Sequence, residues 1–96
     1  MMLQIDIENK LKALKPTLSE RYFIDTIGYF GSFARNEQND NSDIDIIVSF
    51  NKPLGWAFFD LQEFLELELG RKVDLVSSKA LKEQLKDSIL SEVKYI

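Results

Sequence analysis

The chain has 96 residues, of which 45% are hydrophobic and 29% charged, with a formal net charge of −4. These values are typical of a globular protein, and we expect one domain over residues 1–96. Histidine and cysteine are absent, which excludes histidine general bases, thiolate metal sites and disulfides. The acidic balance argues against direct nucleic-acid binding, and no signal-peptide or membrane-spanning pattern is present, so we expect a cytoplasmic protein without a membrane interaction.

The first twenty residues predict an amphipathic helix that packs against the core. Its apolar stripe recurs at helical spacing and consists of Leu3, Ile7, Leu11, Leu14 and Leu18. Proline lacks a backbone N–H and clashes with the preceding turn, so we expect Pro16 to end or kink this helix.

Residues 25–30 predict a short strand that leads directly into Gly31. Gly28 within this strand suggests that another segment approaches the backbone closely. Residues 31–35, with the sequence GSFAR, have helical propensity, and the turn-rich residues 36–42 predict a loop.

Residues 43–50 predict a second strand. A strand alternates its side chains, so Asp43 and Asp45 share one face, whereas the other face is apolar and consists of Ile44, Ile46 and Val48. Asp43 alone could serve the preceding turn, but Asp45 stands inside an apolar run, where a turn role fits poorly. Two carboxylates within about 7 Å of each other repel unless a cation lies between them.

The second half of the chain predicts a helix, a strand and a last helix. The first helix spans residues 56–69 and ends at Gly70, and the strand spans residues 72–77. Ser78 is expected to cap the last helix. The stripe of that helix consists of Leu81, Leu85, Ile89 and Val93. The predicted order is therefore α-β-α-β-α-β-α, an α/β (α+β) chain with helices around a small sheet.

Asp74 is the only carboxylate within the third predicted strand. If the second and third strands are neighbours, Asp74 falls on the face that carries Asp43 and Asp45. The alternative is a solvent-exposed charge on an edge strand, or a partner of Arg71 or Lys72. Three carboxylates suit Mg²⁺, which prefers oxygen ligands and completes its shell with water and phosphate.

Gly31 and Ser32 open a predicted helix, where backbone N–H groups and a hydroxyl can bind phosphate. A Gly-Ser pair is weak evidence alone, and its value comes from standing ten residues before Asp43-Ile44-Asp45. Arg35 either contacts phosphate or forms an ion pair that steadies the loop, and its position one turn after Ser32 slightly favours the ion pair.

Gly31-Ser32, ten residues and then Asp43-Ile44-Asp45 resemble the pattern of the polymerase-β-like nucleotidyltransferases. GSFAR followed by SDIDIIV is similar to the minimal nucleotidyltransferase (MNT) subgroup, and the resemblance continues through the third strand to the last helix. It implies a mixed sheet flanked by helices and two Mg²⁺ ions held by Asp43, Asp45 and Asp74. It also implies transfer of a nucleoside monophosphate from ATP or another nucleoside triphosphate to a hydroxyl, with Asp74 orienting or deprotonating the acceptor.

The resemblance further implies a partner, because small members of this group are commonly encoded beside a HEPN-domain toxin and adenylylate one of its tyrosines as antitoxin. Two alternatives stay open: a non-catalytic module that neutralises a partner by contact, and a nucleotidyltransferase acting on a small molecule. Leu and Phe side chains of the second and last predicted helices could form a surface for a homo- or hetero-oligomer, although core packing explains most of them. One departure from the family motif is Asn36, which stands where glycine is usual, and asparagine tolerates a left-handed backbone better than other non-glycine residues do.

Overall fold

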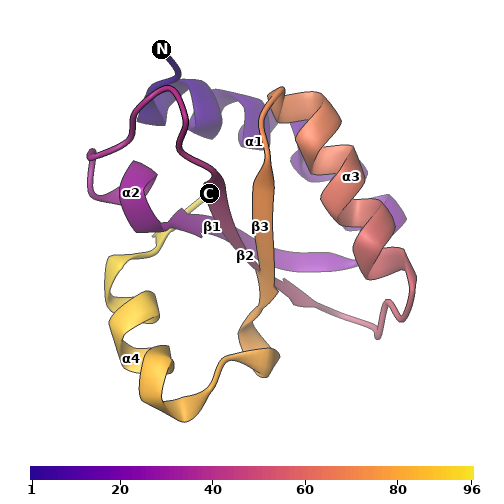
Figure 1. Ribbon diagram of the computed structural model, residues 1–96. Coiled ribbons are helices and arrows are strands. Elements are labelled where there is room, and N and C mark those ends of the chain that lie inside the picture. Colours follow the sequence, from indigo (N-terminus) through magenta and orange to yellow (C-terminus); the bar gives the residue numbers. More distant parts are fainter.

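The computed structural model describes residues 1–96 and contains one four-stranded mixed sheet with strand order β3-β2-β1-β4 (Figure 1). The elements in chain order are α1 (Gln4–Tyr22), β1 (Ile24–Phe30), α2 (Gly31–Ala34), β2 (Ile44–Phe50), α3 (Ala57–Leu69), β3 (Val73–Ser77), the 3₁₀ helix η1 (Ser78–Ala80), α4 (Glu83–Glu92) and β4 (Lys94–Tyr95). The predicted fold class is confirmed, with β4 added at the carboxyl end.

The sheet contains both strand orientations, because the connections differ in length. β1 and β2 are antiparallel and joined through α2 and its loop, whereas β2 and β3 are parallel and joined by the crossover through α3. β3 lies at one edge, and the two-residue β4 pairs antiparallel with β1 at the other edge. β2 therefore lies between β1 and β3.

One face of the sheet packs against α1 and α3 and forms the core. The predicted apolar face of β2 is confirmed, since Ile44, Ile46 and Val48 are fully buried. They share one cluster with residues from both helices, namely Ile7, Leu11, Leu18, Leu61, Leu65 and Leu69. Gly70 ends α3 in a left-handed conformation at φ 66°, as predicted. The core thus fixes which side chains of β2 point to the opposite face.

Pro16 does not end α1, which is one of the two effects that the sequence predicted for it. The helix continues through Pro16 to Tyr22, and both Leu18 and Tyr22 beyond the proline are buried. Proline removes one helical hydrogen bond, but Pro16 itself is exposed and the two buried side chains gain more by keeping the helix on the core. Tertiary packing outweighs the local propensity here.

The carboxyl-terminal quarter also departs from the sequence prediction. Ser78 begins η1 rather than capping α4, whose N-cap is Lys82. No residue of α4 is buried, so the predicted stripe does not reach the core. Leu81, Leu85 and Ile89 instead line an open cavity. No helix in the structure is long and apolar enough to cross a membrane.

Candidate active site

Asp45 and Asp74 lie directly opposite each other on the adjacent parallel strands β2 and β3. In-register neighbours on parallel strands point to the same face, so both carboxylates lie on the face away from α1 and α3. Asp43 immediately precedes β2, two residues from Asp45. The prediction that β2 and β3 would bring Asp74 beside Asp45 is confirmed.

Asp74 is a solvent-exposed charge on an edge strand, which is one of the alternatives that the sequence left open. β3 is the edge strand and Asp74 is exposed, so its charge remains in contact with solvent. Neither Arg71 nor Lys72 forms an ion pair with it. Arg71 instead donates hydrogen bonds to backbone carbonyls of Asn39 (3.2 Å), Asp40 (3.2 Å) and Ser42 (2.8 Å), which holds the loop before Asp43. The interpretation of Asp74 as an ion-pair partner of Arg71 or Lys72 is wrong, and its carboxylate is accessible to solvent.

Burial raises the pKa of the Asp45 carboxyl to about 6, and the neighbouring charge of Asp74 adds to this shift. Asp43 contributes in the same direction, whereas the positive charge of Arg35 opposes it. An excess of negative charge around a partly buried carboxylate is the electrostatic condition that a bound cation relieves.

Gly31 provides the space that the Asp45 side chain occupies. Its φ is +71°, a left-handed conformation that favours glycine, and a Cβ at this position would overlap the Asp45 carboxylate. The Cγ of Asp45 lies 2.9 Å from where that Cβ would be. Gly31 therefore serves the carboxylate site as well as the start of α2.

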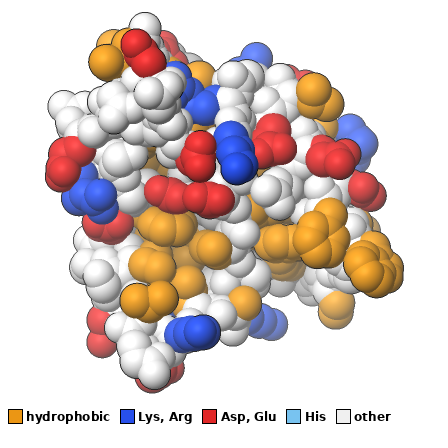
Figure 2. Space-filling view, in the orientation of Figure 1, with side chains coloured by type: hydrophobic (Ala, Val, Ile, Leu, Met, Phe, Trp, Pro, Cys, Tyr) orange, Lys and Arg blue, Asp and Glu red, His pale blue; other side chains and the backbone are white.

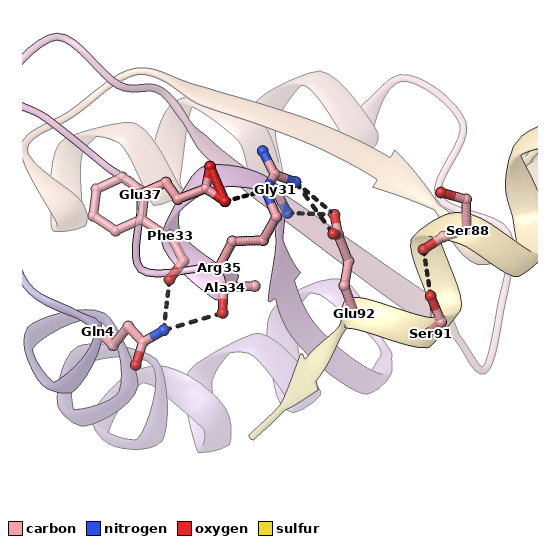
Figure 3. A network of polar contacts seen from close by, with 9 residues as sticks. All are labelled: Gln4, Gly31, Phe33, Ala34, Arg35, Glu37, Ser88, Ser91 and Glu92. Carbon is pink, nitrogen blue, oxygen red and sulfur yellow. Dashed lines mark hydrogen bonds and ion pairs between the residues drawn. The ribbon is translucent and has the colours of Figure 1, made fainter.

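Arg35 follows α2 and forms an ion pair with the last residue of α4. Its guanidinium donates to both carboxylate oxygens of Glu92 at 3.2 Å, and its Nε donates to Glu37 at 3.2 Å (Figure 3). The hydrogen bonds to Glu92 raise the pKa of Arg35. The same Glu92 carboxylate accepts a hydrogen bond of 2.9 Å from the backbone N–H of Gly31. The structural role expected for Arg35 is present as this ion pair.

Asn36, the departure from the family pattern, has a φ of 58°. Asparagine adopts this left-handed conformation more readily than most residues with a side chain. The loop after α2 therefore keeps the backbone geometry that a glycine would permit.

A cavity of about 920 Å³ opens beside the two aspartates. Asp45 and Asp74 contribute to its lining together with apolar side chains, including Phe30, Val76, Leu81, Leu85 and Ile89. Figure 2 shows hydrophobic side chains in the region framed by α4 and β3, directly below a row of acidic side chains. The carboxylates thus border a space large enough for a bound small molecule.

The chemistry of this donor set suits a hard divalent cation. Asp43, Asp45 and Asp74 offer only carboxylate oxygens, which Mg²⁺ prefers, and the missing side chain at Gly31 leaves room around Asp45. No group of three acidic side chains is close enough in the structure to share one ion. The expected cluster of Asp43, Asp45 and Asp74 is therefore not assembled around one position, and the neighbouring Asp45 and Asp74 are the pair that could hold a cation.

The family of nucleotidyltransferase domains matches residues 5–96. The chain therefore belongs to this family, and it is a nucleotidyltransferase. Among its relatives, protein adenylyltransferase MntA of Thermococcus cleftensis is 41% identical over 97 residues, a match that covers 100% of this chain and 98% of that protein. A protein of Methanocaldococcus jannaschii, provisionally named an adenylyltransferase, is 43% identical, and the match covers 95% of each chain.

Solved structures show the same fold. A protein assigned provisionally as a minimal nucleotidyltransferase superposes with a TM-score of 0.80 and 30% identity over 97% of this chain and 95% of that one. A toxin–antitoxin complex with AMP-PNP has a TM-score of 0.70 and 27% identity, covering 98% of this chain and 72% of its counterpart. An MNT antitoxin in complex with a tri-AMPylated HEPN toxin of Shewanella oneidensis has a TM-score of 0.67 and 26% identity, covering 97% and 71%. The resemblance to minimal nucleotidyltransferases is confirmed.

The sequence did not predict that Glu92 would reach this site. Its only local signal is an acidic residue in the last turn of a helix, where a negative charge is unfavourable. The contact depends on β4, because pairing of Lys94 with Tyr29 returns the chain to β1, whose last residue precedes Gly31. That pairing was itself not predicted.

Proposed function

We propose that this chain transfers AMP from ATP to a tyrosine hydroxyl of a HEPN-domain toxin and so acts as its antitoxin. The observation that carries the proposal is that Asp45 and Asp74 lie opposite each other on adjacent strands, and that the missing side chain at Gly31 leaves room for the Asp45 carboxylate. The similarity to an MNT antitoxin solved in complex with a HEPN toxin supports a HEPN-domain protein as the partner. The similarity to a toxin–antitoxin complex with AMP-PNP supports ATP as the nucleotide. Relatives named protein adenylyltransferases support the reaction.

The nucleotide would lie with its triphosphate near Gly31, Ser32 and Arg35. These residues offer a backbone N–H, a hydroxyl and a guanidinium, which are the usual donors to phosphate oxygens. The cavity bordered by Val76 and Ile89 would receive the remainder of the nucleotide.

In the proposed reaction the acceptor oxygen attacks the α-phosphorus and forms a new phosphate ester. The bond from the α-phosphorus to the bridging oxygen breaks, and pyrophosphate leaves with that electron pair. Asp74 is the candidate to accept the hydroxyl proton, because it is exposed where a macromolecular acceptor can reach it. Arg35 would stabilise charge on the triphosphate.

Asp43, Asp45 and Asp74 would hold Mg²⁺ in this site. When bound, Mg²⁺ neutralises triphosphate charge and lowers the pKa of a coordinated hydroxyl. The raised pKa of Asp45 supports this assignment. Burial and the neighbouring negative charges make an ionised Asp45 unfavourable, and a bound cation would offset that cost.

The test uses ATP labelled at the α-phosphate, Mg²⁺ and the product of any HEPN-type reading frame adjacent to the gene for this chain. Wild type should label that protein, and Asp45→Asn should lower the rate by at least about 100-fold because a charged ligand is lost. Asp25→Asn, an exposed aspartate at the start of β1, is the matched control and should keep full activity.

Neutralisation by contact alone gives a different result in the same assay. The toxin would then be inhibited equally by wild type and by Asp45→Asn, without any transfer of label. A small-molecule acceptor would leave the HEPN-domain protein unlabelled and uninhibited. Either outcome overturns the proposed function.

A further inference from the structure

The Glu92 carboxylate lies at the two groups that the proposed function assigns to phosphate. It accepts a hydrogen bond of 2.9 Å from Gly31 N–H and is 3.2 Å from the Arg35 guanidinium, as Figure 3 shows. A backbone N–H and a guanidinium that converge on one anion are typical of phosphate recognition. In this structure the anion is supplied by the protein.

The position of Glu92 is not explained by the stability of α4. It is the last residue of the helix, where backbone carbonyls make the local potential negative and an acidic side chain is unfavourable. No residue of α4 is buried, so packing does not force the helix into this place. The helix is anchored beyond its end, where β4 pairs with β1.

Glu37 provides a contrast within the same network. It also pairs with Arg35, at 3.2 Å from Nε, but it makes no contact with Gly31. Glu37 is more exposed than Glu92, with side-chain exposures of 63% and 28%. Only Glu92 therefore occupies the position shared by both donors.

We propose that Glu92 is an internal substitute for a phosphate group, which holds Gly31 and Arg35 until the triphosphate of the nucleotide displaces it. This inference rests on the proposed function, because it takes Gly31 and Arg35 as triphosphate ligands. The bound nucleotide and the Glu92 contact exclude each other. Displacement also releases the only polar link between α4 and the Gly31–Arg35 segment, so nucleotide binding loosens α4.

If Glu92 competes with the nucleotide, removing its charge should increase the affinity for the nucleotide. Glu92→Gln keeps the size of the side chain but removes its charge, so it should tighten binding of Mg-ATP by about three- to tenfold, the range of a modest charged contact. If Glu92 instead positions Arg35 for the nucleotide, the same variant should weaken binding. Glu37→Gln removes an equal charge from the other partner of Arg35 and should change the affinity less than twofold.

The measurement is calorimetry of wild type, Glu92→Gln, Glu92→Ala and Glu37→Gln with Mg-ATP and with inorganic tripolyphosphate. Tripolyphosphate lacks base and sugar, so a similar gain for both ligands in the Glu92 variants supports competition at the phosphates. In wild type, tripolyphosphate should also shift the Gly31 amide resonance in NMR spectra, a readout that needs no variant.

The outcomes separate this inference from the proposed function. The inference is overturned if both Glu92 variants bind Mg-ATP no more tightly than wild type does. It is also overturned if Glu37→Gln increases the affinity as much as Glu92→Gln does. In either case, binding of Mg-ATP by wild type still supports the proposed function. Failure of wild type and all variants to bind Mg-ATP overturns both.

Discussion

At the scale of single residues, Gly31 leaves the space at the start of α2 that the Asp45 carboxylate occupies. Gly31→Ala should abolish nucleotide transfer and destabilise the fold by about 1–3 kcal/mol, because it adds a left-handed alanine and displaces Asp45. Thermal unfolding and label transfer measure the two effects.

Gly55→Ala is the matched control for this change. Gly55 also has a positive φ, 56°, but no atom lies within 4 Å of an added Cβ. It should carry a similar backbone strain and keep full activity. Equal activity of the Gly31 and Gly55 variants would show that Gly31 does not shape the carboxylate site.

The Asp45 carboxylate should cost stability in the metal-free protein at neutral pH. Its pKa is raised from 3.8 to about 6, so the folded state binds a proton more tightly than the unfolded state does. The associated stability is present below pH 3.8 and is lost as pH rises to about 6. Because Asp45 is only partly buried, screening reduces the loss to about 1 kcal/mol.

Urea unfolding of wild type and Asp45→Asn in a chelating buffer measures this loss as a difference. The asparagine variant should gain about 1 kcal/mol relative to wild type between pH 4 and pH 7. A difference that stays constant across this window would contradict the raised pKa.

At the scale of elements, β4 depends on the absence of a side chain at Gly28. A Cβ there would lie 2.7 Å from Val93 Cγ1 and 2.9 Å from the Lys94 carbonyl oxygen. Gly28→Ala should therefore separate β4 from β1, with a loss of about 1–2 kcal/mol. Hydrogen exchange should rise at residues 94–96, and unchanged protection there would contradict the role of Gly28.

The elements that could be predicted from sequence are those whose local pattern also agrees with the core. The alternation in β2 placed Ile44 and Ile46 inward and Asp45 outward, and Gly70 marked the end of α3. The pattern of β3 likewise identified Asp74, and its register with Asp45 followed once the two strands were neighbours.

The elements that could not be predicted depend on contacts between distant residues. Helical continuity through Pro16 follows from burial of Tyr22 on the core, which local propensity does not include. The two-residue β4 has no strand pattern of its own and exists through pairing with β1. The contact of Glu92 with Gly31 spans 61 residues and follows from that pairing.

At the scale of the whole molecule, the core between the sheet and the helices α1 and α3 holds the strands that carry the aspartates. Leu65→Ala in α3 should destabilise the protein by about 2–5 kcal/mol, because it leaves a cavity at a fully buried position. Leu67→Ala is the matched control on the same helix, since Leu67 is 83% exposed, and it should change stability by less than about 0.5 kcal/mol. Chemical denaturation measures both, and similar losses would contradict the placement of the core.

The arrangement of the molecule leaves a cavity beside Asp45 and Asp74 on the carboxylate face of the sheet, while the other face is filled by the core. β2 contributes to both, since Ile46 enters the core and Asp45 borders the cavity. β3 at the edge keeps Asp74 accessible, which the proposed transfer to a hydroxyl on another protein would require.

The most direct measurement of the proposed site is anomalous diffraction from crystals grown with Mn²⁺ and a non-hydrolysable ATP analogue. We expect a metal peak at coordination distance, roughly 2.0–2.2 Å, from Asp45 and Asp74, with Asp43 turned toward it and the triphosphate at Gly31 and Arg35 in place of Glu92. A nucleotide that binds elsewhere, or a site without metal at saturating Mn²⁺, would contradict the three-carboxylate account.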